Sequence, residues 1–145
     1  MSATRESILA ALLAAVQATG YFTSTGRRAR DPASVGPAQS PACFLVRSGE
    51  EIRKDSGAKP AVRILKVHAF VYNDVGANAN AVPETVLNNA MEALESALGV
   101  DNFSLGACTL GGLVRAAYLS GEVVTAPAEL TGKAMQIVPI EIVIP

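Results

Sequence analysis

The stretch VRILKVHAFVY at residues 62–72 decides the fold that this sequence predicts. Successive side chains of a β-strand point to opposite faces, so residues 63, 65, 67, 69 and 71 share one face and residues 64, 66, 68, 70 and 72 share the other. The second face mixes Lys66 and His68 with Phe70, as in a sheet with one side turned to water or to another subunit. We therefore expect a long strand with only one face in the core.

Three more strands are expected beside this one. They cover residues 42–47, residues 113–124 with a turn or bulge at Ser120 and Gly121, and residues 133–144. Valine and isoleucine side chains fall in phase through the last of them. Pro139 has no N–H to donate to a neighbouring strand, so it favours an edge or bulged position for this last strand.

Two helices complete the expected fold. The first begins after the N-cap candidate Thr4 and ends at Gly20. The second begins at Pro83, which suits the first helical turn, and ends at Gly99. The order of helix, strand, strand, helix, strand, strand predicts an α+β fold with a mostly antiparallel sheet of about four strands and both helices packed on one face.

Composition points to a single domain, residues 1–145, with an unusually neutral surface. Of the 145 residues, 50% are hydrophobic and 17% are charged, and the formal net charge is −1. This balance excludes a disordered chain and gives no overall attraction to nucleic acid or to an anionic membrane. No apolar run reaches about 18 residues and no basic segment precedes the first apolar stretch, so we expect neither a membrane span nor a signal peptide. Part of the apolar surface is expected to meet another protein.

Two segments are expected to project from this domain as extended arms. Residues 21–41 contain several glycines and prolines, and residues 48–60 form a polar connection typical of a long hairpin. The first arm carries Arg27, Arg28 and Arg30, the only concentrated positive charge of the sequence. These arginines either make the loop soluble or pair with acidic groups of a neighbouring subunit or with DNA passing close by.

The sequence offers no catalytic constellation. Its single histidine, His68, lies in the middle of a strand and is interpreted as structural. A nucleophile pair or a metal site built from His68, Cys43 and Cys108 is disfavoured, because these residues form no close-spaced motif. We therefore expect no enzyme activity, no metal and no cofactor. The two cysteines are interpreted as small buried hydrophobic residues, with a disulfide between Cys43 and Cys108 as the alternative.

Several motifs occur in a fixed order along most of the chain. They are the amphipathic segment TRESILAALLAAV at 4–16, Pro41-Ala42 leading to Gly49-Glu50, the strand VHAFVYND at 67–74 followed by a Pro-initiated helix, TLGGLVR at 109–115, and a last strand with alternating isoleucines. Their order and spacing resemble the tail terminator, or tail completion, proteins of long-tailed bacteriophages. The two cysteines depart from that pattern.

This resemblance implies a structural virion protein, assembled in the host cytoplasm and located at the head-proximal end of the tail. Such proteins form a hexameric ring that caps the tail tube, ends tube polymerisation and joins the tail to the neck. The implied partners are other copies of the chain, the tail tube protein, a neck or head-completion protein and, as a further candidate, a sheath protein. Genomic DNA would pass through the ring without sequence-specific binding, and no membrane is implied. The residues expected on surfaces between subunits or between rings are Arg27, Arg28, Arg30, Glu50, Arg53 and Lys54.

Two other classes of function stay open. One is a different phage neck or tail component of similar build, such as a head-tail connector or a minor tail protein. The other is a small ligand-binding module or enzyme, for which the sequence supplies no site. The size of the ring would separate the first class from a tail terminator, and a bound small molecule would favour the second.

Overall fold

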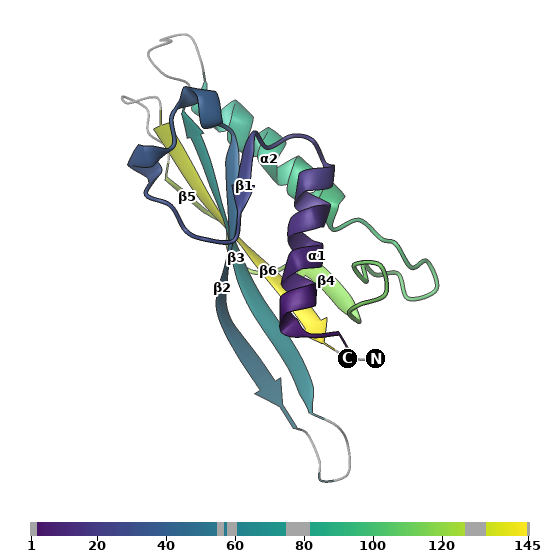
Figure 1. The fold of residues 1–145 in the computed structure, drawn as a ribbon. Helices are drawn as coiled ribbons and strands as arrows, with labels where there is room; N and C mark the ends of the chain where they lie inside the picture. Colours follow the sequence, from purple (N-terminus) through teal and green to yellow (C-terminus); the bar gives the residue numbers. More distant parts are fainter. Residues whose placement is uncertain (1–2, 55–56, 58–60, 75–81, 127–132, 145) are drawn as a thin grey trace.

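The computed structural model describes residues 3–54, 57, 61–74, 82–126 and 133–144, which contain one mixed β-sheet and two α-helices (Figure 1). Six strands make up the sheet within these residues: β1 Ser24–Gly26, β2 Ala42–Arg53, β3 Val62–Asp74, β4 Ala116–Leu119, β5 Val124–Ala126 and β6 Lys133–Ile144. Their order is β1-β2-β3-β6-β4, and β5 pairs with a second stretch of β6. The two long strands β3 and β6 therefore form the centre of the sheet.

The expectation of about four mostly antiparallel strands was wrong, although the α+β class holds. β1 lies within the segment expected to be an irregular arm, and it pairs in parallel with β2, with Ser24 opposite Ala42. Residues 113–124, expected to form one strand, instead contribute β4 and β5, which both run antiparallel to β6. Gly121 separates the two with a φ of 107°, a conformation that would strain a residue with a side chain. The sheet is thus mixed and has six strands.

Pro139 shows how β6 can be an inner strand although proline cannot donate a hydrogen bond. The Pro139 carbonyl accepts a hydrogen bond from the Ser120 N–H at 3.1 Å, in the gap between β4 and β5. The nitrogen and the carbonyl oxygen of one strand residue point to the same side, so the missing N–H also faces this gap. The prediction of an edge or bulged position for this strand was therefore wrong. Pro139 lies opposite the gap between β4 and β5, where no neighbouring strand needs a hydrogen bond from its nitrogen.

The connection expected over residues 48–60 begins as strand. β2 continues to Arg53 and pairs with the start of β3, with Arg53 opposite Val62. A bulge between Arg47 and Gly49 shifts the register by one residue, which explains why the alternation of side chains is hard to follow in the sequence. The two strands project together as a ribbon below the body of the sheet (Figure 1).

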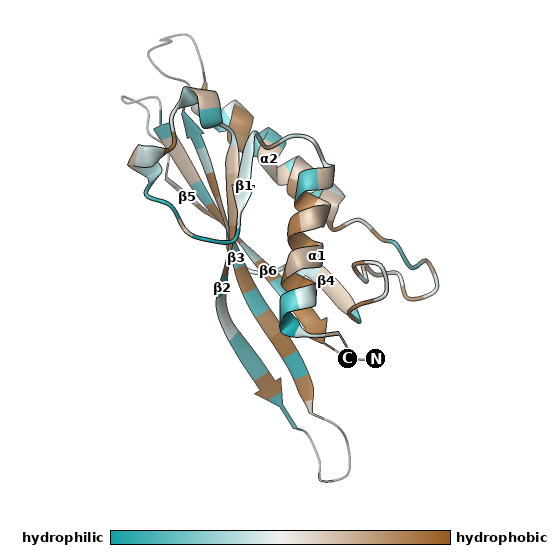
Figure 2. Ribbon diagram, in the orientation of Figure 1, coloured by the Kyte–Doolittle hydropathy of each residue, from teal (hydrophilic) through white to brown (hydrophobic). Residues whose placement is uncertain are grey.

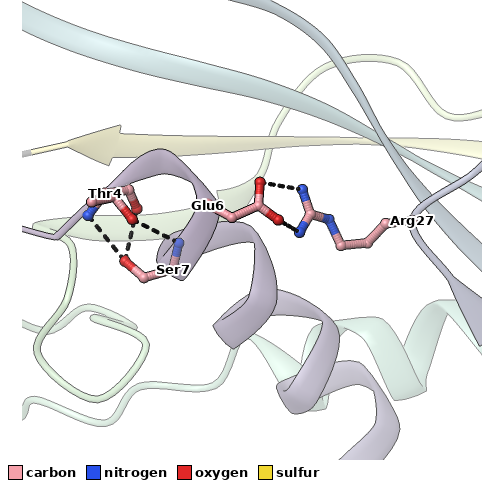
Figure 3. A network of polar contacts seen from close by, with 4 residues as sticks. All are labelled: Thr4, Glu6, Ser7 and Arg27. Carbon is pink, nitrogen blue, oxygen red and sulfur yellow. Dashed lines mark hydrogen bonds and ion pairs between the residues drawn. The ribbon is translucent and has the colours of Figure 1, made fainter.

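The helices are α1 Arg5–Ala18 and α2 Pro83–Ala97. The side chain of Thr4 accepts a hydrogen bond from the Ser7 N–H, and the Ser7 hydroxyl accepts one from the Thr4 N–H (Figure 3). This reciprocal cap satisfies backbone donors that a helix start otherwise leaves free. Two short 3-10 helices, η1 Pro32–Ser34 and η2 Pro37–Gln39, lie between β1 and β2.

Both α-helices pack on one face of the sheet, and the main core lies between them and the strands. Polar residues interrupt the apolar ones along β3, as Figure 2 shows by hydropathy, whereas most residues of β6 are apolar. The fully buried side chains of this core are Ile8, Leu12 and Val16 from α1, Leu87 and Leu94 from α2, Leu65, Val67 and Val71 from β3, and Val138, Ile140 and Ile142 from β6. The two-faced strand expected at residues 62–72 is confirmed.

A second, smaller cluster covers part of the opposite face. Val35, between the two 3-10 helices, packs with Ala42, Phe44 and Tyr72. The Tyr72 hydroxyl also donates a hydrogen bond to the Arg30 carbonyl at 3.1 Å, which holds the preceding segment against β3. The segment between β1 and β2 therefore folds over this face at the end of the sheet that carries β1.

Candidate subunit interface

The face of the sheet opposite the helices carries apolar side chains that are only half buried. His68 lies opposite Pro139, and Phe70 lies between Phe44 and Ile137 in the register of β2, β3 and β6. The half-buried residues of this open face are Val46, Lys66, His68, Phe70, Met135, Ile137, Pro139, Glu141 and Val143. A sheet face that is only partly covered, with apolar groups on its uncovered part, is suited to contact with another protein.

The charged side chains of this open face have polar partners within the chain. Glu51 lies between the Arg53 guanidinium at 2.5 Å and the Lys66 ammonium at 3.6 Å. The hydrogen bond from Arg53 is the main reason why the pKa of the Glu51 carboxyl is lowered. The Tyr118 hydroxyl donates to Glu141 at 3.1 Å. The face is consequently close to neutral, so a partner meets apolar groups and paired charges.

His68 has the surroundings of a structural residue. Its ring makes an edge-on contact with Phe70, with the ring centroids 6.2 Å apart. Among the described residues, no group of three or more histidine, cysteine, aspartate or glutamate side chains is placed to hold a metal ion. In the same part of the chain, neither α1 nor α2 has the length and apolar character that crossing a bilayer requires.

The three predicted loop arginines lie around one pocket of about 520 Å³ next to β1. Arg27 is bound within the chain, because both of its terminal nitrogens donate to the Glu6 carboxylate (Figure 3). This contact lowers the pKa of Glu6. The guanidinium carbon of Arg30 lies 5.6 Å from the centre of the Phe44 ring, which forms the apolar floor of the pocket. Arg28, Arg30 and Asp31 are exposed around the pocket, so its rim has a net positive charge.

The other three predicted residues lie on the projecting ribbon, but not on one surface. Glu50 points to the helix side and accepts two hydrogen bonds from Arg5, at 2.5 and 2.8 Å, and its side chain is 11% exposed. Arg53 and Lys54 are exposed at the end of β2. The structure thus brings the three arginines together, and it places Glu50 and Arg53 on opposite faces of the ribbon. That all six lie between subunits stays a prediction.

Cys43 and Cys108 are buried as free thiols in the main core. Cys43 lies on β2, and Cys108 forms an isolated bridge with Ala117 at the outer edge of β4. Burial raises the pKa of the Cys43 thiol to about 12 and also raises that of Cys108. Because the reactive form of cysteine is the thiolate, neither thiol is poised for chemistry at neutral pH.

Sequence reasoning missed two exposed apolar residues in the loop that follows α2. Phe103 is 90% exposed and Leu105 is 65% exposed. The sequence shows these residues between Asp101, Asn102 and Gly106, which favour turns. The available signal was the presence of bulky apolar residues inside a turn-forming segment. Turns lie at the protein surface, so such side chains are left exposed.

Comparisons with protein-family models and with curated proteins each gave no match. Among solved structures, one similar chain belongs to the virion of a native gene transfer agent particle. The match covers 89% of this chain and 83% of that chain, with 11% sequence identity and a TM-score of 0.48. A likeness at this identity and TM-score does not establish a shared family or a shared function.

Proposed function

We propose that this protein is a structural virion protein of the tail terminator kind, which forms a ring at the head-proximal end of a phage tail tube. The observation that carries the proposal is the open face of the sheet, where Phe70, Ile137 and Pro139 remain half exposed. When another protein covers apolar surface that no helix covers, the complex is stabilised, because that surface is removed from water. In the proposed ring, other copies of the same chain supply such a partner.

The order of the sequence motifs gives the proposal its more specific content. The segment 4–16 that resembles the first helix of tail terminators forms most of α1, and the segment 67–74 forms the second half of β3. The segment 109–115 makes the turn that leads into β4. The motifs are thus distributed over the whole fold rather than confined to one element, as expected when the resemblance concerns a complete subunit.

In the proposed role, identical subunits close into a hexameric ring through head-to-tail contacts. Such contacts join two different surfaces of the subunit, and they close when the rotation between neighbours divides the circle evenly. The ring would end polymerisation of the tail tube and present its other side to a neck or head-completion protein. A sheath protein is a further candidate partner, and genomic DNA would pass through the ring without sequence-specific contacts.

Imaging of the purified protein tests this proposal. We expect six-fold rings in negative-stain electron microscopy and a hexamer in mass photometry, either for the protein alone or after addition of tail tubes. Tubes assembled in the presence of the protein should carry one ring at one end and stop growing there. A chain that stays monomeric in both conditions, or a ring of another symmetry, would contradict the proposal.

Substitution of the loop arginines gives a second test of the same function. Replacing Arg27, Arg28 and Arg30 by alanine should weaken contacts within the ring or with the tube, because Arg28 and Arg30 present exposed guanidinium groups that form no ion pair with the described residues. The matched control replaces the exposed Arg63 of β3 by alanine, since it carries the same charge outside this pocket and outside the loop that follows α2. Hexamers of the triple variant that still bind tubes would sink the predicted role of these arginines.

A further inference from the structure

The loop after α2 holds an aromatic side chain in water. Residues 100–107 form a narrow turn closed by a bridge between Asn102 and Ala107. The Asn102 side chain accepts a hydrogen bond from the Leu105 N–H at 3.1 Å, inside the turn. Phe103 lies at this turn with 90% of its surface exposed. Leaving a phenylalanine side chain in water forgoes roughly 1.5–3 kcal/mol of burial free energy.

Asp101 fixes the base of this loop. One oxygen of its carboxylate accepts hydrogen bonds from the N–H and the hydroxyl of Thr109, at 2.6 and 2.8 Å, and the other accepts one from the Gly111 N–H at 2.9 Å. These donors lower the pKa of Asp101, so the carboxylate is charged at neutral pH and the contacts persist. The loop is therefore organised before any partner arrives, which reduces the entropy lost on binding.

A receiving site for an aromatic ring lies at the opposite edge of the sheet. The bridge from Cys108 to Ala117 places the Phe103 loop beyond β4, at one end of the strand order. The pocket lined by Thr25, Arg28, Arg30 and Phe44 adjoins β1, at the other end. In Figure 1 the loop projects to the right, whereas the segment that lines the pocket lies to the left. One subunit therefore carries the projecting side chain and the pocket on opposite sides.

We infer that Phe103 of one copy occupies the pocket beside β1 of the next copy. The inference rests on the proposed ring and assigns its contact surfaces. A volume of about 520 Å³ accommodates a phenylalanine together with the neighbouring Leu105. The Arg30 guanidinium already lies over Phe44, and its exposed side provides a planar cation on which a second aromatic ring stacks.

Charge supports the same pairing of surfaces. Glu92 and Glu95 are exposed on the last turns of α2, directly before the loop, and the described residues give neither an ion pair. The pocket rim presents the exposed guanidinium groups of Arg28 and Arg30 and one exposed carboxylate, Asp31, so the rim keeps a net positive charge. Docking of the loop brings an acidic helix end towards a basic rim, so the electrostatic contribution and the apolar contribution favour the same orientation. Both surfaces occur once per subunit, as a closed head-to-tail ring requires.

Site-specific photo-crosslinking of the full-length chain tests this contact. A photoreactive benzoylphenylalanine at position 103 should, on irradiation of the assembled protein, form crosslinks to residues 25–34 of a different copy. Mixing isotope-labelled and unlabelled chains before irradiation identifies the crosslinks that join two copies. The matched control places the same group at Val82, which is 59% exposed at the other end of α2 and should give no crosslink to residues 25–34.

Two substitutions measure the strength of the contact by sedimentation velocity over a concentration series. Phe103→Ala should raise the dissociation constant of the assembly by about tenfold or more, as expected for a central aromatic anchor. Arg30→Ala should do the same, and Val82→Ser should leave the dissociation constant unchanged.

The outcomes separate this inference from the proposed function. Intact rings in which position 103 crosslinks to another segment of the neighbour, or to the tube protein alone, would overturn the inference and leave the ring standing. Rings that assemble equally well with Phe103→Ala would also overturn it. A chain that stays monomeric at every concentration and on tail tubes would overturn both.

Discussion

Arg5, in the first turn of α1, donates two hydrogen bonds to the carboxylate of Glu50 on the projecting half of β2. The two residues are 45 positions apart in the sequence, and the contact joins the start of the N-terminal helix to the ribbon of β2 and β3. Arg47 adds a weaker contact at 3.9 Å to the same carboxylate. The ribbon is therefore connected to the helical layer by a polar contact as well as by its strand pairing.

Glu50→Gln should lower the free energy of unfolding at neutral pH, because a neutral amide binds a guanidinium less strongly than a carboxylate does. The hydrogen bond from Arg5 holds the pKa of Glu50 below its usual range. A carboxyl with a lowered pKa stabilises the folded state above its unfolded pKa, and it loses this contribution as the pH falls through the folded value. Urea unfolding should therefore show a difference between the wild type and the variant that shrinks from about pH 7 to about pH 3.

The control for this measurement is Glu95→Gln, which removes an exposed carboxylate that has no ion pair among the described residues. Its effect on unfolding should be small at every pH. A Glu50→Gln effect that stays constant or grows as the pH falls would show that the contact with Arg5 does not stabilise the fold.

Substitutions of two isoleucines of β6 should distinguish an effect on folding from an effect on association. Ile140 is 1% exposed and faces the helices, so Ile140→Ala should cost about 2–5 kcal/mol of unfolding free energy. Ile137 lies on the open face opposite Phe70, so Ile137→Ser should cost less than half as much and mainly weaken assembly. Chemical denaturation of the dilute protein measures the first effect, and mass photometry over a concentration series measures the second. Equal loss of unfolding free energy in both variants, with assembly unchanged, would contradict the proposal that the open face contacts another copy.

Both thiols should be unreactive in the folded protein. The pKa of Cys43 is raised to about 12 by burial, and Cys108 is also buried, so neither supplies much thiolate or access to a reagent. A colorimetric disulfide reagent at neutral pH should therefore react slowly with the native chain and quickly with both cysteines in denaturant. Mass spectrometry without reductant should find two free thiols. A mass lowered by two thiol hydrogens would instead establish the disulfide alternative.

The turn before β4 should be sensitive to a single methyl group. Gly112 has a φ of 92°, so Gly112→Ala should destabilise the fold by about 1–2 kcal/mol through backbone strain, although no atom lies within 4 Å of the added carbon. Gly36→Ala is the matched control, because Gly36 also has open space around it and has a φ of −90°. This control should be neutral or slightly stabilising. Thermal unfolding of the two variants compares the effects directly, and equal midpoints would contradict the strain argument.

The local elements and their faces follow from signals within short stretches of the sequence. Thr4 and Pro83 mark the starts of the two helices, because capping groups and proline act within one turn of the chain. The alternation along residues 62–72 established which side chains of β3 enter the core, because the period of a strand is a property of its own backbone. The second face, which mixes Lys66 and His68 with Phe70, indicated a side turned either to water or to another subunit.

Which strands and side chains pair with one another became visible in the three-dimensional structure alone. β1 is too short to show any periodicity. It forms a strand because it pairs in parallel with β2, with Ser24 opposite Ala42. The bulge at Arg47 hides the continuation of β2, since it reverses the faces on which the following residues lie. The contact of Arg5 with Glu50 and the placement of Phe103 and Arg30 at opposite edges follow in the same way from strand pairing. Such pairings join residues far apart in the chain, whereas the signals in a sequence act over one turn or one strand.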